Sequence, residues 1–168
     1  MKPTFPLIAI LLLIMTASCT DNFQQEESLY AEEENEIIES TALLATDFEK
    51  EVLDAVNEYR SSLGLNTLVF TDNAYDEAES HTEYMISKGQ LSHDNFRTRA
   101  SRISQKTNAS CVAENVAKNY NTAETVLNAW LNSNSHKNTI EGDFTHTTIT
   151  VRKDANETLF YTQIFIKK

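Results

Sequence analysis

The sequence predicts an α+β domain in which helices come first and an antiparallel sheet comes last. Apolar residues recur at the helical spacing of three and four positions in four segments between residues 46 and 131. The spacing then changes to the alternation of a strand in residues 145–152, and β-branched and aromatic side chains dominate residues 159–166. Residues 154–157 separate these two segments with a turn-forming composition, which is typical of a β-hairpin.

The first two predicted helices have recognisable ends. Residues 46–49 have the Thr-x-x-Glu form of a capping box, and Gly64 is a typical helix stop. One face of this first helix is apolar: Phe48, Val52, Val56, Tyr59 and Leu63. After a short link, residues 65–70, a second helix starts from the cap of residues 71–73 and stops at Gly89. Its inner face carries Ala74, Ala78, His81 and Met85.

Two further helices are predicted before the strands. The third holds Phe96, Ala100 and Ile103 on its buried side and is expected to direct Arg97, Arg99 and Arg102 outward. The fourth begins near Thr122, carries Val126, Leu127, Trp130 and Leu131, and ends at the polar run of residues 132–135. Trp130 is expected in the core rather than stacked on a ligand.

Composition and charge exclude several classes of function. The chain has 168 residues, enough for one domain, and 14 Lys and Arg against 25 Asp and Glu, for a net charge of −11. Without a basic block, DNA and RNA are not expected as partners. The 3 glycines are too few and too dispersed for a phosphate-binding loop or a G-x-S-x-G elbow, so nucleotide binding and an α/β-hydrolase are disfavoured as well.

The N-terminus has the features of an export signal. Residues 1–18 contain one lysine, a short apolar run and small residues at the end, which is typical of a signal peptide. The run is shorter than the roughly 20 residues that span a bilayer, so a permanent transmembrane anchor is the weaker alternative. Small residues directly before Cys19 resemble the lipobox of bacterial lipoproteins. We therefore expect an exported protein, lipid-anchored through Cys19 to a membrane of the bacterial cell envelope.

An acidic segment, residues 19–45, follows the predicted signal peptide. It contains eight Asp and Glu residues and no Lys or Arg, which predicts a disordered tether. Capture of cations or of a basic partner is the alternative for such a run, although a self-repelling spacer is the simpler one. The remaining residues, 46–168, carry a charge of only −4 and form the predicted domain.

The histidines are the natural candidates for chemistry. None of His81, His93, His136 and His146 belongs to an H-E-x-x-H or zinc-finger spacing, so a metal site would have to combine distant segments. His93 and His136 each follow a predicted helix, where loop side chains can converge on a cleft or simply cap and face solvent. Glu114 lies in an apolar stretch, and its carboxylate needs a partner such as a histidine. His81 is expected to be a hydrogen-bonded core residue and His146 to be exposed.

Four segments in order resemble motifs of the CAP superfamily, which comprises the cysteine-rich secretory, antigen-five and pathogenesis-related proteins. The segments are residues 91–96, 113–117, 130–140 and 161–165, and residues 56–60 match the family's first helix. The resemblance is to the bacterial, SCP-like branch, in lipoprotein form, and runs from about Phe48 to the C-terminus. It implies a three-layer α-β-α sandwich with a central antiparallel sheet, and a cleft that gathers two histidines with one or two glutamates.

The resemblance assigns the cleft residues one by one. His93 matches the first cleft histidine, Glu114 the glutamate of the G-E-N motif and His136 the histidine of the S-x-G-H motif. In this sequence Ala113 and Ser135 stand where those motifs have glycine, and the second glutamate of animal members has no counterpart. His93, Glu114 and His136 are thus the expected ligands of Zn²⁺ or another divalent cation, and also the candidate catalytic residues. They equally suit a metal-free polar cluster that orients a ligand.

Three functions remain open at this point. The first is a binding or interaction module that takes a cation and a lipid or small hydrophobic ligand. The second is a hydrolase that uses a metal-bound water or a His-Glu base on a cell-envelope peptide or glycan. The third is a purely structural surface domain. Cys111 lies three residues before Glu114, and a buried, inert thiol is expected there more than a reactive one.

Overall fold

The computed structural model describes residues 47–168, which belong to one compact unit, Thr41–Lys168. The predicted signal peptide, Cys19, the tether and Thr46 lie outside the described residues. Within the described range, no helix combines the length and the apolar character needed to cross a bilayer. The elements are a helix of residues 47–62, then β1 (Val69–Phe70), the 3-10 helix η1 (Asp72–Ala74), α2 (Tyr75–Lys88), α3 (Phe96–Thr107), β2 (Cys111–Lys118), α4 (Ala123–Leu131), α5 (Asn134–Ile140), β3 (His146–Lys153) and β4 (Leu159–Lys167).

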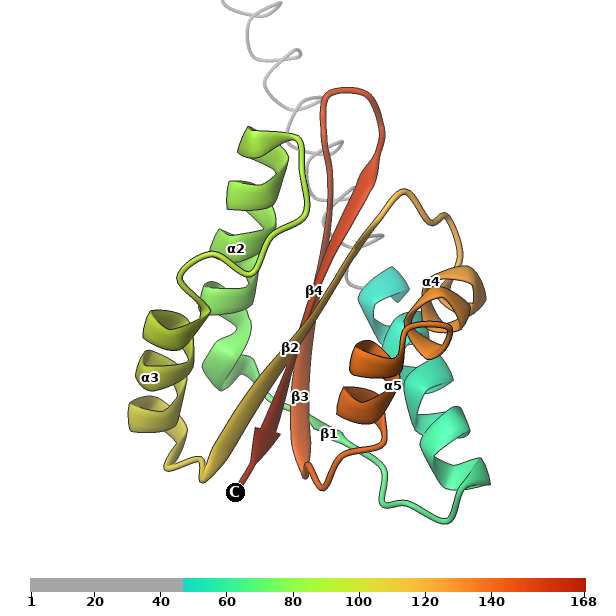
Figure 1. Ribbon diagram of the computed structural model, residues 1–168, viewed down its shortest axis with the longest axis vertical. Helices are drawn as coiled ribbons and strands as arrows, with labels where there is room; N and C mark the ends of the chain where they lie inside the picture. The colour runs from blue at the N-terminus through green and yellow to red at the C-terminus, as the bar shows by residue number, and fades with distance from the viewer. Residues whose placement is uncertain (1–46) are drawn as a thin grey trace, which may run out of the picture. The chain divides into compact units, whose positions relative to one another are not determined.

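These elements form three layers around a four-stranded sheet of order β1-β3-β4-β2 (Figure 1). α2 and α3 cover one face, and the helix of residues 47–62 covers the other together with α4 and α5. β2 and β3 each pair antiparallel with β4, whereas β1 pairs parallel with β3. The predicted α+β sandwich is confirmed, with two strands that were not predicted. β1 lies in the predicted link of residues 65–70 and makes the sheet mixed, and β2 lies between α3 and α4 in the chain.

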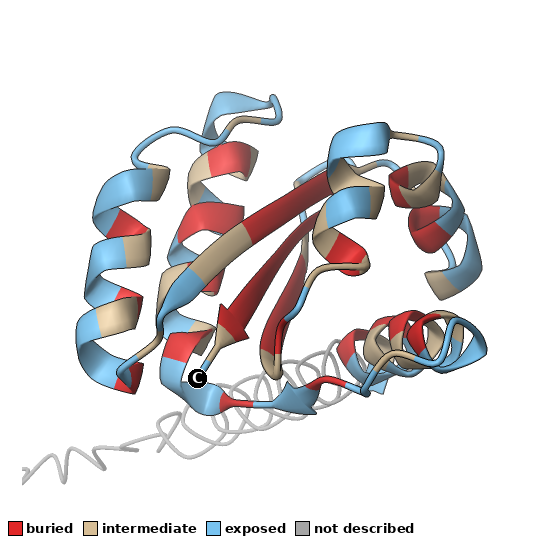
Figure 2. Cartoon of the chain, turned by 60° about the horizontal axis from the view of Figure 1, so that its bottom comes forward, coloured by how far each residue is buried: buried red, intermediate tan, exposed pale blue. Residues whose placement is uncertain are grey.

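β4 is buried without a break from Phe160 to Ile166, because both faces of the sheet are covered and successive side chains point into opposite layers (Figure 2). Tyr161 and Phe165 pack with the helix of residues 47–62, α4 and α5, whereas Ile164 and Ile166 pack against α2 and α3. Trp130 belongs to the first of these clusters, as predicted, and its indole Nε1 donates to the carbonyl oxygen of Val116 at 3.1 Å. β2 therefore has α3 on one side and α4 on the other.

The predicted helix stops are confirmed, whereas the predicted capping box includes Thr46 and so lies outside the described residues. Gly64 and Gly89 have φ values of 74° and 65°, the left-handed conformation that glycine adopts without strain. Glu49, by contrast, is buried and accepts from the backbone N–H of Val151 at 2.9 Å and from the hydroxyl of Tyr75. Burial raises the pKa of Glu49. Its carboxylate therefore connects the helix of residues 47–62 to β3.

Two residues of the first helix fix distant segments. Asn57 makes a pair of hydrogen bonds with the backbone of Leu68, which holds the chain as it enters β1. The fully buried guanidinium of Arg60 donates to the carbonyl oxygens of Ile140 and, at 2.9 Å, of Gly142. Arg60 thus satisfies carbonyls at the C-terminal end of α5 and fixes that helix against the core.

Two predictions about helices were wrong. The polar run of residues 132–135 ends α4, as expected, but α5 begins at Asn134, so His136 lies in the first turn of a helix rather than in a loop. Ser and Asn side chains compete for backbone hydrogen bonds and favour both the end of one helix and the start of the next. Arg99 is 4% exposed, not outward-facing, because it lies one turn before Ile103 on the buried side of α3.

Candidate functional site

The candidate site is centred on the carboxylate of Glu114, which projects from β2 and is only 8% exposed. Its Oε1 lies 2.8 Å from Nδ1 of His93, and its Oε2 accepts from Nε of Arg99, also at 2.8 Å. A second guanidinium nitrogen of Arg99, Nη2, lies 2.6 Å from the same Oε2. The side chains of Glu114 and Arg99 are almost inaccessible to solvent, so each charge is compensated by the other rather than by water.

Arg99 also orders the segment before its own helix. Its Nη1 donates to the carbonyl oxygen of Asp94 at 3.2 Å, in the turn that follows His93. One arginine therefore holds both the carboxylate and the backbone of the loop that carries the histidine. Helical spacing could have revealed this residue, since Arg99 and Ile103 are four positions apart and share a face.

His81 is the second residue that the site adds to the predicted set. It is 3% exposed on α2, and its Nε2 donates to the carbonyl oxygen of Ser92 at 2.8 Å, next to His93. The same nitrogen lies 3.7 Å from Oε1 of Glu114. Burial lowers the pKa of His81 and outweighs the opposing effect of Glu114. The predicted hydrogen-bonded core role is confirmed, and the ring also fixes the loop before His93.

His93 lies in the predicted loop and is half exposed. A carboxylate only accepts hydrogen bonds, so Nδ1 of His93 is the donor to Glu114. When the imidazole is neutral, its Nε2 is then an acceptor on the opposite edge of the ring. Glu114 thus fixes both the orientation and the tautomer of the more exposed imidazole.

His136 approaches the same region from the other face of the sheet. Its backbone carbonyl accepts from Nδ2 of Asn115, the β2 residue after Glu114, at 3.1 Å. Burial lowers the pKa of His136, and the charge of His93 lowers it further. His93 and His136 are therefore within electrostatic reach of each other. His146, at the start of β3, is half-buried rather than exposed, and its Nδ1 pairs with the Thr145 hydroxyl at 2.8 Å.

The observed contacts of Glu114 differ from those expected of a direct metal ligand. Among residues 47–168, no group of three or more His, Cys, Asp or Glu side chains is arranged to hold a metal ion. Both oxygens of Glu114 already accept from His93 and Arg99. Glu114 therefore contacts the Nδ1 edge of the His93 ring, as carboxylates contact metal-binding histidines at many zinc sites. The three-residue ligand set stays a prediction.

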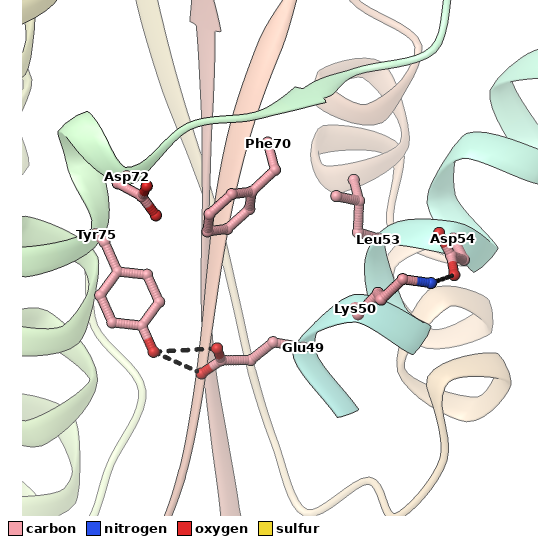
Figure 3. Close-up of a pocket in the computed structure, with 7 residues that line it drawn as sticks. All are labelled: Glu49, Lys50, Leu53, Asp54, Phe70, Asp72 and Tyr75. Carbon is pink, nitrogen blue, oxygen red and sulfur yellow. Dashed lines mark hydrogen bonds and ion pairs between the residues drawn. The ribbon is translucent and has the colours of Figure 1, made fainter. Parts of the chain in front are cut away.

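A separate pocket lies at the opposite edge of the sheet, beside β1 (Figure 3). It has a volume of about 620 Å³ and is lined by Glu49, Lys50, Leu53, Asp54, Phe70, Asp72 and Tyr75. Leu53, Phe70 and Tyr75 form apolar walls, and the Tyr75 hydroxyl donates to Glu49 at one end. Phe70 is 43% exposed, an unusual state for a large apolar side chain. Sequence reasoning did not find this pocket, because its walls come from three separate segments.

Cys111, the first residue of β2, differs from its prediction. Its thiol is free and exposed, so the expected burial was wrong. Cys111 begins β2, which is an edge strand of the sheet.

Comparison with curated proteins finds two relatives in Bacillus subtilis strain 168. An uncharacterised membrane protein, YlbC, is 29% identical over 129 residues, covering 74% of this chain and 36% of that protein. An uncharacterised protein, YkwD, is 31% identical over 107 residues, covering 59% of this chain and 40% of that protein. The chain therefore spans well under half the length of either relative.

Solved structures share the fold. An outer surface protein from Borrelia burgdorferi superposes with a TM-score of 0.64 at 23% identity, over 73% of this chain and 93% of that one. An extracellular SCP-domain protein from Bacillus anthracis gives 0.63 at 26% identity, over 74% and 41% of the two chains. Residues 53–165, two-thirds of the sequence and all of the candidate site, match the family described as CAP, cysteine-rich secretory proteins. This chain thus belongs to the CAP family.

Proposed function

We propose that this protein is a CAP-domain binding module of the bacterial cell envelope, whose cleft over Glu114 binds a divalent cation through His93 and His136. The supporting observation is the contact between Glu114 and His93, in which a buried carboxylate holds one edge of a half-exposed imidazole. An imidazole held in this way keeps its second nitrogen in a fixed direction, as a ligand-binding group requires.

The chemistry of the neighbouring groups favours a cation such as Zn²⁺. Burial and His93 lower the pKa of His136, so at neutral pH its ring offers an uncharged nitrogen lone pair. Arg99 compensates the charge of Glu114, which leaves neutral nitrogen donors rather than a net charge as the recognition feature. A bound Zn²⁺ would supply a Lewis acid with positions left for water or ligand.

Export and anchoring belong to the same proposal. The relatives are described as a membrane protein, an outer surface protein and an extracellular protein. These descriptions support an exported protein, and the segment before Cys19 supports a lipid anchor at that residue. Residues 19–45 would then act as the spacer between the membrane and the domain.

A lipid or small hydrophobic molecule is the second proposed ligand. The pocket beside β1 supports it, because its walls of Leu53, Phe70 and Tyr75 offer apolar surface that is partly open to solvent. A volume of about 620 Å³ is within the usual range for small-molecule sites. Nucleic acids and nucleotides are not among the proposed partners.

Hydrolysis is the alternative function, and the Glu114–His93 pair also supports it. With Nδ1 donating to Glu114, Nε2 of His93 is oriented to take a proton from a water that attacks a peptide or glycosidic bond. Glu114→Gln would then abolish turnover in a folded protein. A screen of envelope peptides and glycans that finds no turnover at any pH would eliminate this alternative.

The cation proposal is tested by calorimetric titration of ZnCl₂ into the purified full chain. We expect saturable binding that is lost in the His93→Ala/His136→Ala variant and retained in His146→Ala, the matched control on β3. Circular dichroism checks that each variant is folded. Equal binding by the double variant, or no binding by any of the proteins, would contradict the proposal. A large drop in melting temperature with no change in binding would instead indicate the structural role.

A further inference from the structure

β2 is an edge strand, and its pairing with β4 determines which peptide groups it exposes. The N–H of Asn119 donates to the carbonyl of Leu159 at 2.9 Å, just beyond the end of the ladder. In an antiparallel pair, every second residue of a strand makes its backbone hydrogen bonds to the partner strand. With this register, the odd-numbered residues of β2 bond to β4. The backbone groups of Val112, Glu114 and Val116 therefore point away from the sheet.

Most of these outward groups have no partner within residues 47–168. The carbonyl of Val116 accepts from the Trp130 indole. The N–H and C=O groups of Val112 and Glu114 make no hydrogen bond in the described structure. Outward-facing residues recur about every 6.7 Å along a strand. The edge therefore presents backbone donors and acceptors at the same spacing as those of another extended strand.

This unpaired edge runs through the candidate site. On one face the side chain of Glu114 contacts His93, and on the other the side chain of Asn115 contacts the His136 carbonyl. In two views, β2 passes between α3 on one side and α5 on the other (Figures 1 and 2). A strand added to β2 would lie about 4.8 Å from it, between the two histidines.

We propose that the outward edge of β2 at Val112 and Glu114 docks an extended peptide segment of a partner protein, as an added strand in the His93–His136 cleft. This inference rests on the proposed cleft and names the class of its partner. The complementarity is electrostatic, because alternating N–H and C=O dipoles on β2 are matched by those of a second backbone and not by an acyl chain. A peptide with basic side chains also suits a domain of charge −4.

An isolated strand fits this edge better than a second copy of the chain. α3 and α5 flank β2, so the edge of another folded copy would bring its own two helices against them. A single extended segment has no such layers. β1, at the other edge of the sheet, is a comparison within the same molecule. It is only two residues long, so it offers no comparable series of outward-facing backbone groups.

The test uses NMR amide exchange on the purified full chain, with a capped heptapeptide of alternating threonine and lysine as the probe. In the free protein, the amides of Val112 and Glu114 should exchange faster than those of Ala113 and Asn115. Saturating peptide should slow Val112 and Glu114 exchange by at least about tenfold and leave their neighbours unchanged. The same peptide with every backbone nitrogen methylated keeps its charge but lacks donors, and it should have no effect.

Substitutions at two places distinguish peptide docking at the β2 edge from Zn²⁺ binding by the histidines. Val112→Pro removes one outward N–H without removing a bond to β4, a change that edge strands tolerate, and Val112→Ala is the control that keeps the N–H. Val112→Pro should lose the peptide response and still bind Zn²⁺, whereas His93→Ala/His136→Ala should lose Zn²⁺ and keep the exchange response at Val112. Peptide docking without Zn²⁺ binding would contradict only the cation proposal.

Three results would overturn the inference. Slow exchange of Val112 and Glu114 in the free protein would mean that the edge is already paired. Slowing that grows with protein concentration alone would identify a second copy as the occupant. An unchanged exchange rate at millimolar peptide, or an equal response to the methylated peptide, would show that no strand is added.

Discussion

The guanidinium of Arg99 donates from Nε to Oε2 of Glu114 at 2.8 Å and places Nη2 2.6 Å from the same oxygen as an ion pair, while the other carboxylate oxygen accepts from His93. The carboxylate is thus shared between a buried side chain of α3 and an exposed loop. Its stability and its control of the His93 ring depend on the same arginine.

Arg99→Met is expected to lower the free energy of unfolding by about 3–5 kcal/mol, because it leaves the buried carboxylate of Glu114 without its charge partner. Urea denaturation at pH 7 measures the change. Arg97→Met, on the exposed side of the same helix, is the control and should change stability by no more than about 0.5 kcal/mol. A loss below about 1 kcal/mol in Arg99→Met would indicate that this pair behaves like a surface ion pair.

Stability should fall as the pH is lowered through the ordinary histidine pKa. Burial lowers the pKa of His81 from 6.5 in the folded state, so below pH 6.5 the unfolded chain takes up a proton that the folded chain does not. Arg99 and His93 act in the same direction, and Glu114 opposes them. Urea midpoints measured from pH 7.5 to 5 should therefore decrease.

The variant His81→Gln should show a shallower decrease over the same range. The slope should not vanish, since the pKa values of His136 and His146 are also lowered by burial. An identical pH dependence in the variant and the wild type would mean that His81 does not titrate differently on unfolding.

Arg60→Met is expected to loosen α5, because it removes the donors to the carbonyls of Ile140 and Gly142. Burial lowers the pKa of Arg60, because removing the guanidinium from water disfavours its charged form. Unsatisfied buried carbonyls of this kind destabilise by about 1–3 kcal/mol each. Amide exchange in α5 should accelerate more than exchange in α2, and uniform acceleration across both helices would contradict a local role.

Phe70→Asp should weaken hydrophobic ligand binding in the pocket beside β1. Phe70 is 43% exposed, so the substitution places a charge on a pocket wall without disrupting the core. A fluorescent fatty acid serves as the probe, and its affinity should drop at least about tenfold. Leu63→Asp is the matched control, since Leu63 is 50% exposed and does not line the pocket. Equal losses in both variants would argue against binding in this pocket.

Cys19→Ser should abolish acylation. Cells grown with a labelled fatty acid should incorporate the label into the wild type and into Cys111→Ser, but not into Cys19→Ser. Unacylated protein should then leave the membrane fraction. Label that persists in Cys19→Ser would contradict the lipid anchor.

The candidate site could be anticipated from the sequence only in part. The motifs around His93 and Glu114 predicted two residues that the fold brings into contact across 21 positions. Arg99 was missed because an arginine among several polar residues resembles a solvated face. Its position four residues before Ile103 was the overlooked sign of burial.

The missed elements have physical reasons of their own. β2 carries Glu114 and Asn115 in consecutive positions and is covered on both faces, so it lacks the simple alternation of a one-sided strand. α5 begins with Asn134, Ser135 and His136, which are poor helix formers, and tertiary contacts hold it in place. The pocket beside β1 could not be predicted, because its lining residues meet only after three layers have packed.

The bonds of Arg60 also have a consequence for the order of folding. Three of its carbonyl acceptors lie 80 to 84 positions later in the chain, and the Glu49 carboxylate meets Val151 after 102 positions. Contacts so distant in sequence slow folding, because the intervening chain must be ordered before they form. A growing chain would therefore carry the first helix with an unburied guanidinium and carboxylate until the final hairpin emerges. Completion of the domain should be a late, C-terminal event.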